Sequence, residues 1–149
     1  MTTAKWATPD SAENVLTTEL NALANSANKI TGTAVSNDQA AELDMYADFT
    51  LYLAEQASAR DAGGRVDLYI LPQSDGTNYP YGGDALDPSP NHWVGSFVFD
   101  AAVTARYEVL RGILLPPADF HVLVINETGQ ALAATLNTLT MRRYNIESA

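Results

Sequence analysis

The 149-residue chain contains no cysteine, which excludes disulfide bonds and thiolate metal sites. Its only two histidines, His92 and His121, lack the H-x-x-H or H-x-x-x-H spacing of a metal site. No apolar run reaches the ~20 residues that a membrane-spanning helix needs. The first residues, MTTAKWATPD, contain no apolar stretch typical of a secretion signal, which predicts a chain that assembles in a cytoplasm.

Basic residues are also scarce, because eight Lys and Arg stand against 18 Asp and Glu. Fourteen of the acids lie within residues 1–100, and the formal net charge is -10. Nucleic-acid binding depends on basic side chains that release counterions from phosphates, and anionic membranes attract the same side chains. The composition therefore predicts neither nucleic acid nor a membrane surface as a direct partner.

Motifs for catalysis are missing as well. The sequence has no G-x-S-x-G, and Gly82-Gly83 lacks the lysine and helix of a phosphate-binding loop. Asp44 and Asp48 have the spacing of a solvated strand face. Asn126-Glu127-Thr128 matches a glycosylation pattern, but we interpret it as a turn. We expect no catalytic residue, no cofactor and no metal, and therefore a protein that is not an enzyme.

The sequence is rich in short apolar segments that are separated by turns of Gly, Pro, Asn and Asp. The segment LDMYADFTLYLAE alternates apolar and polar residues, as a half-buried strand does. Gly112 is a candidate β-bulge in the strand that contains it. This pattern predicts a mainly β protein, an antiparallel β-sandwich with a jelly-roll as the specific architecture. The predicted strands are 43–53, 66–71, 93–99, 106–115, 119–126 and 135–145.

Two of these strands carry further expectations. In 93–99, the alternation places Trp93, Gly95, Phe97 and Phe99 on one face. The segment 119–126 is apolar on both faces at its centre, which predicts an interior strand in a two-layer structure.

The N-terminal segment has a different pattern. Residues 9–28 have helical periodicity, with Asp10 as N-cap and Glu13 at the third helical position. We expect residues 1–38 to form an N-terminal helical or extended arm, and residues 39–149 to form one globular β-sandwich body. The apolar stripe of the helix comprises Ala12, Leu16, Leu20, Leu23 and Ala27.

The longest predicted loop is LPQSDGTNYPYGGDALDPSPN, residues 71–91, and loops of this length are usually functional or disordered. Its Asp75, Asn78, Asp84 and Asp87 offer oxygen ligands for Ca²⁺, but their spacing matches no EF-hand. We therefore favour turns over a cation site. Its tyrosines and the Trp that follows give rigid contact area, for which we favour an interface over a sugar-binding surface.

Arg142 and Arg143 are adjacent on the last predicted strand, so they point to opposite faces. This favours one arginine paired within the chain and the other facing an acidic patch on a neighbouring subunit.

The sequence as a whole resembles small virion structural proteins of tailed bacteriophages, of the capsid cement or decoration kind. The resemblance is carried by LYILP…DGTNY and by LPPADFHVLVINETGQALAA…NTL. It implies a β-sandwich on the outer capsid surface of the virion that bridges major capsid subunits and stabilises the shell. Its partners would be the major capsid protein and copies of itself, as a dimer or trimer.

Two other functions remain open. The chain is alternatively a tail, neck or baseplate structural protein, or a receptor-binding or carbohydrate-binding module that stacks sugars on Tyr79, Tyr81 and Trp93. A small glycan hydrolase using Asp75 and Asp84 is the least favoured alternative. The residues that we expect at an interface are Trp6, Leu16, Leu20, Leu23, Asp75, Tyr79, Tyr81, Trp93, Arg142 and Arg143.

Overall fold

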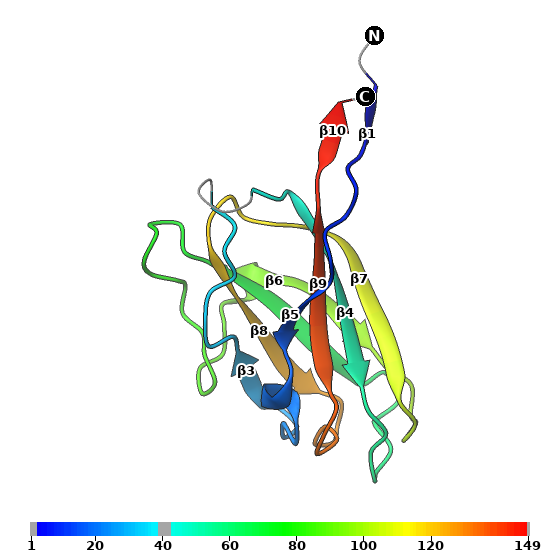
Figure 1. Ribbon diagram of the computed structural model, residues 1–149. Coiled ribbons are helices and arrows are strands. Elements are labelled where there is room, and N and C mark those ends of the chain that lie inside the picture. The colour runs from blue at the N-terminus through cyan, green and yellow to red at the C-terminus, as the bar shows by residue number, and fades with distance from the viewer. Residues whose placement is uncertain (1–2, 39–42, 149) are drawn as a thin grey trace.

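The computed structural model describes residues 3–38 and 43–148, which form two four-stranded antiparallel sheets packed face to face (Figure 1). The front sheet has the strand order β2-β9-β4-β7, and the back sheet has the order β3-β8-β5-β6. The front strands are β2 (Glu13–Leu16), β4 (Tyr46–Leu53), β7 (Arg106–Leu114) and β9 (Thr138–Tyr144). The back strands are β3 (Asn28–Ile30), β5 (Arg65–Pro72), β6 (Trp93–Val98) and β8 (Phe120–Glu127).

The strand order is that of a jelly-roll, as the sequence predicts. Strands pair in nested fashion, so that β5 pairs with β6, β4 with β7, β3 with β8 and β2 with β9. A two-stranded ribbon adds a further level, because β1 (Ala4–Trp6) pairs with β10 (Ile146–Ser148). This ribbon leaves the sandwich and carries both chain ends at its tip (Figure 1).

The core lies between the two sheets and follows from the alternation in the sequence. Along β4, intermediate and buried residues alternate without exception, and Phe49 and Leu51 are fully buried. Val66 and Leu68 of β5 face them from the back sheet in the same cluster. Each such side chain contributes about 1.5–3 kcal/mol by leaving water, so the alternation fixes which face of each strand turns inward.

The predicted bulge at Gly112 is confirmed. The register between β4 and β7 shifts between Ala47 and Phe49, opposite the segment that contains Gly112. Gly112 has φ of +66°, a left-handed conformation that favours glycine. Its N–H is released from the ladder and donates to Asp48 Oδ1 at 2.9 Å, so the bulge orients an acidic side chain on the outer face.

The predicted N-terminal helix over 9–28 is wrong. Glu13–Leu16 is a strand of the front sheet, and only Thr18–Leu20 forms a single 3₁₀ turn, η1. Positive φ values at Ala22 and Ser26 exclude a continuous helix. Pairing with β9 and burial of apolar side chains between the sheets outweigh the helical periodicity, because a short helix is marginal in water.

The division into an arm and a body also changes. The segment up to residue 38 contributes a strand to each sheet, so of the predicted extended arm only the ribbon strand β1 lies apart from the sandwich. The body begins with β2 rather than at residue 39. Residue 39, at the predicted boundary, lies outside the described residues.

Strand β6 departs from the predicted alternation at its first residue. Gly95, Phe97 and Phe99 are buried as expected, but Trp93 is half exposed. The register between β5 and β6 shifts between Leu68 and Tyr69, and this irregularity separates Trp93 from the inward-facing set. Its indole N–H donates to Ser96 Oγ at 3.3 Å.

Helical structure in the described part of the chain is limited to η1 and a second 3₁₀ turn, η2 (Pro90–His92). None of the helices in residues 3–38 and 43–148 is long and apolar enough to cross a membrane.

Candidate functional site

The ribbon end of the sandwich carries a concentration of exposed apolar side chains. In the ribbon, Trp6 is paired with Ile146, while Lys5 forms an ion pair with Glu147 at 3.1 Å. Because side chains alternate along a strand, one face of the ribbon is apolar and the other is charged. The large apolar residues exposed at this end are Trp6, Leu43, Met45, Leu114 and Ile146.

Three aromatic rings meet where the ribbon joins the front sheet. Tyr46 of β4 and Tyr144 of β9 are cross-strand partners and stack with 5.8 Å between ring centroids. Trp6 packs edge-on against both rings, at 5.9 and 5.4 Å. Edge-to-face packing stabilises such pairs by ~1 kcal/mol beyond their burial, so the indole has a defined orientation although Trp6 as a residue is 64% exposed.

Beside this aromatic cluster, the outer face of the front sheet is hollowed by about 330 Å³. Two charged side chains line the hollow, Asp48 of β4 and Arg142 of β9. The Tyr144 hydroxyl donates to Asp48 Oδ1 at 3.1 Å. Burial and this bond to a carboxylate raise the pKa of Tyr144, so its hydroxyl stays protonated at neutral pH and can keep donating. The remaining lining residues are Trp6, Ala7 and Pro9.

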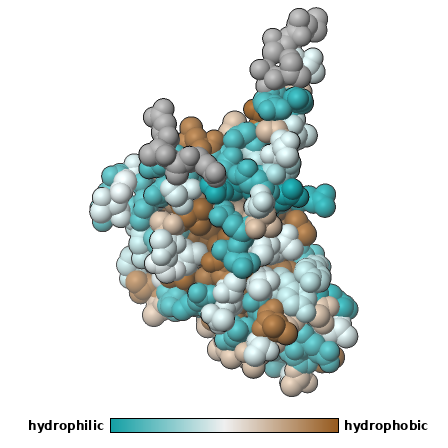
Figure 2. All heavy atoms as spheres, viewed as in Figure 1, coloured by the Kyte–Doolittle hydropathy of each residue, from teal (hydrophilic) through white to brown (hydrophobic). Residues whose placement is uncertain are grey.

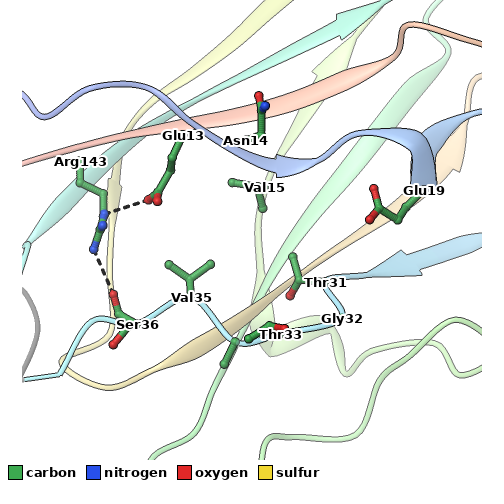
Figure 3. A pocket seen from close by; sticks show the side chains of 11 residues that line it. Glu13, Asn14, Val15, Glu19, Thr31, Gly32, Thr33, Val35, Ser36 and Arg143 are labelled. Carbon is green, nitrogen blue, oxygen red and sulfur yellow. Dashed lines mark hydrogen bonds and ion pairs between the residues drawn. The ribbon is translucent and has the colours of Figure 1, made fainter.

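A second, larger opening of about 470 Å³ lies between β2 and the segment that follows β3 (Figure 3). The opening lies at one side of the sandwich. Between these two segments, apolar residues are visible on a face that is otherwise mostly polar (Figure 2). Arg143 closes one end of it with bonds to Glu13 at 3.0 Å and to the Ser36 carbonyl oxygen at 3.0 Å. Arg143 also lies 3.6 Å from Asp44, so this arginine is paired within the chain, as one of the two was expected to be.

The long loop, residues 73–91, folds back over the outer face of the back sheet. Lys29 bonds Asp84 at 2.5 Å, and the Asn28 side-chain amide donates to Asp87 at 3.0 Å. Above the sheet, Gly82 sits so close to Leu71 and Leu123 that an added Cβ would lie 3.0–3.4 Å from them. Both leucines are therefore fully buried although they lie outside the core cluster. The loop is a cover for β8, which explains why this strand is apolar on both faces.

Asp75 of this loop is used in a turn, whereas Asp84 and Asp87 anchor the loop to Lys29 and Asn28. Asp75 accepts hydrogen bonds from the backbone N–H groups of Thr77 and Asn78 and from the Asn78 side chain. These bonds, led by that of the Asn78 side chain, lower the pKa of Asp75 to about 2. Among the residues that the structure describes, no group of three His, Asp or Glu side chains is placed to hold a metal ion.

The aromatic residues that the sequence singles out in and after the loop have different surroundings. Tyr79 packs on the His121 ring at 4.4 Å, so that part of its surface is used within the chain. Tyr81 is 70% exposed and Trp93 is 51% exposed. Among the described residues, neither ring contacts the aromatic cluster of Trp6, Tyr46 and Tyr144, whose two tyrosines lie on the other sheet.

For two residues, the prediction that they lie at an interface is wrong. Leu16 and Leu20 are buried in the core of the chain itself, so they are not available to a neighbouring subunit. Leu23 is partly buried against the same core. The prediction treated them as the free face of a helix, whereas the strand β2 and the turn η1 direct them between the sheets.

Several residues of the ribbon end are not predicted by the sequence. Asp48 was interpreted as part of a solvated face, and Tyr46 and Tyr144 were not singled out. The signal was present, since both tyrosines lie on the polar faces of amphipathic strands, where an aromatic residue leaves an apolar surface exposed. What the sequence did not give was the pairing of β4 with β9, which brings them together.

No family model matches this chain, and no curated protein matches it. The solved structures that are similar in fold include two carbohydrate-binding modules. One is the CBM36-1 domain of a multidomain xylanase from the hindgut metagenome of Trinervitermes trinervoides, with 13% identity, a TM-score of 0.46 and coverage of 100% of this chain and 98% of that chain. The other is a carbohydrate-binding module, CBM36, in complex with calcium and xylotriose, with 17% identity, a TM-score of 0.41 and 99% coverage of both chains. The phage-particle interpretation has no counterpart in these comparisons.

Proposed function

We propose that this chain is a non-catalytic structural protein of a tailed-bacteriophage particle, of the cement or decoration kind. In this role it binds major capsid subunits on the outer capsid surface and bridges them. The sequence resemblance supports the class of protein, and the exposed apolar ribbon end supports attachment to a protein neighbour. A position in the tail, neck or baseplate would use the same surface.

The ribbon is the single observation that carries this proposal. An isolated two-stranded ribbon is marginal in water, and this one has only three residue pairs. Its apolar face continues onto the sandwich through Tyr46, which Trp6 contacts, and through Leu114, the cross-strand partner of Tyr46, which is 66% exposed. Large exposed apolar patches of this kind mark interaction surfaces, and a neighbouring subunit that covered this one would stabilise the ribbon.

Charge and copy number fit such a role. A net charge of -10 keeps the free subunit soluble before assembly. Because a particle presents many equivalent positions, linked copies bind multivalently, and a modest affinity at each contact suffices.

The test is attachment of single-residue variants to particles that lack the chain. Leu114→Asp and Ile146→Asp place a charge in the apolar surface, and we expect occupancy to fall at least about tenfold, corresponding to a loss of ~1.4 kcal/mol. Leu136→Asp is the matched control for Leu114→Asp, because Leu136 is 71% exposed, close to the 66% of Leu114, but precedes β9 at the opposite end of the sandwich. Equal occupancy by all three variants, or purified particles of the source phage that contain none of the chain, would contradict the proposal.

Carbohydrate binding is a second candidate function, and one observation favours it on the loop side of the molecule. Tyr81 and Trp93 expose enough of their rings to stack on a sugar. If this surface binds host glycans, Trp93→Ala should abolish binding of the isolated protein to cells, with Tyr107→Ala on the front sheet as the control.

A further inference from the structure

Asp48 and Arg142 stand directly opposite each other on β4 and β9, yet they form no ion pair in the described part of the chain. Cross-strand partners of opposite charge normally attract each other. Here each is held by other groups. Asp48 Oδ1 accepts from Gly112 N–H and from the Tyr144 hydroxyl, and Arg142 Nε donates to the Asp10 carbonyl oxygen at 2.7 Å.

This arrangement leaves hydrogen-bonding capacity directed at the hollow. Among the described residues, Asp48 Oδ2 and the two Nη groups of Arg142 have no hydrogen-bond partner. Both side chains line the hollow beside Trp6. The site therefore combines a hydrogen-bond acceptor, a multiple donor and an oriented aromatic ring.

The chemistry of these three groups selects among ligand classes. One negative and one positive group give the hollow no net charge, so neither a simple anion nor a simple cation is favoured. A ligand that both donates and accepts at neighbouring atoms satisfies the pair, as adjacent hydroxyl groups do. An indole offers an apolar surface for stacking, and Pro9 and Ala7 add apolar wall.

We propose that this hollow is a binding site for a neutral sugar, in which Asp48 and Arg142 hydrogen-bond adjacent ring hydroxyls and Trp6 packs against the C–H face of the ring. The site is built before the ligand arrives. The rings of Tyr46 and Tyr144 fix the indole, and the bulge at Gly112 fixes the carboxylate, so little ordering remains to be done on binding. The inference does not depend on a place in a phage particle, nor on the exposed aromatics of the loop.

The experiment is calorimetric titration of the full chain with four neutral oligosaccharides, namely cellotetraose, xylotetraose, mannotetraose and chitotetraose, each up to about 10 mM. We expect at least one to bind and to change the tryptophan fluorescence. Arg142→Met and Trp6→Ala should each raise the Kd at least about tenfold. Arg111→Met is the matched control, because Arg111 is an exposed arginine of β7 that does not line the hollow, and it should leave the Kd within about twofold.

Trp93→Ala separates this site from the loop surface. Binding that survives Trp93→Ala but not Arg142→Met supports the hollow. Three results would overturn the proposed site in the hollow. They are binding that is lost only with Trp93→Ala, an equal loss of binding in Arg111→Met and Arg142→Met, and no binding of any of the four sugars. Attachment to particles is measured separately with Leu114→Asp. If the sugar site is not found, the proposed virion function is unaffected, and if attachment fails, the proposed sugar site is unaffected.

Discussion

The two sheets are built from equal numbers of strands with the same nested pairing, but they differ in how far their outer faces are covered by the rest of the chain. The loop over 73–91 covers the outer face of the back sheet, so that Leu71 and Leu123 are buried there. Within residues 3–38 and 43–148 no loop covers the outer face of the front sheet in this way, and Tyr46, Tyr144 and Val109 remain at least partly exposed. The difference teaches that an apolar residue on an outward face is a binding surface only where the chain has not already covered it.

The largest expected effect tests the cover itself. Leu123→Ala removes a buried side chain beneath the loop and should lower the free energy of unfolding by about 3 kcal/mol. Val109→Ala on the open face should change it by no more than about 0.5 kcal/mol. Urea unfolding of both variants measures the contrast, and similar values would show that the loop does not seal the back sheet.

The next largest loss of stability is expected for one of the two adjacent arginines, Arg142 and Arg143. Arg143 is nearly buried among Glu13, Asp44 and Ser36, so Arg143→Met removes its ion pairs with Glu13 and Asp44 and should cost about 2–3 kcal/mol. Arg142→Met on the exposed face should stay within about 0.5 kcal/mol. Thermal unfolding of the pair distinguishes them, and a reversed order would contradict the internal pairing.

A smaller effect concerns one anchor of the loop. Burial acts to raise the pKa of Asp84, but hydrogen bonds from Lys29 and from the Ile30 N–H outweigh it, so that the pKa is lowered. A lowered folded-state pKa means that stabilisation is present above the unfolded value of about 3.9 and disappears as the pH falls through the lower folded value. Asp84 is half exposed, so Asp84→Asn should cost less than about 1 kcal/mol at pH 7.

Urea unfolding of Asp84→Asn and of the unchanged protein at several pH values measures that loss. The difference between them should shrink as the pH falls below about 4, where the carboxyl group becomes protonated. A difference that stays constant down to pH 2 would show that the carboxylate is not the anchor.

The smallest effect is local. Asp75 should titrate with a pKa of about 2, observable in the NMR shifts of its carboxyl carbon. Asn78→Ala removes the largest cause, the side-chain hydrogen bond, and should move the midpoint toward the ordinary value near 3.9. An unchanged midpoint would contradict the assigned cause.

The sequence predicts the sandwich well because alternation reports burial directly. In β4 the inward residues follow from spacing alone, and in β7 the glycine within the strand pattern predicts the bulge at Gly112. The segment over 9–28 fails for a physical reason, since an alanine-rich periodicity is compatible with a helix until a partner strand offers hydrogen bonds. Only the fold supplies β9 as that partner.

The candidate site is harder to predict than the fold. Asp48, Arg142 and Trp6 are separated by up to 136 positions, and only the pairing of β1, β4, β9 and β10 brings them together. The sequence drew attention to the long loop because of its composition. The structure shows that much of this loop packs on its own sheet, while the open aromatic surface lies elsewhere.

The nested pairing also dictates an order of closure. The innermost pair, β5 with β6, is joined by the shortest stretch of chain, while the ribbon pair is separated by almost the whole molecule. Since the entropy lost on closing a loop grows with its length, we expect the inner hairpin to form early and the ribbon last, and ribbon amides to exchange with solvent first. A partner that binds the ribbon would therefore stabilise the strand pair that forms last and keep the outermost level of the jelly-roll closed.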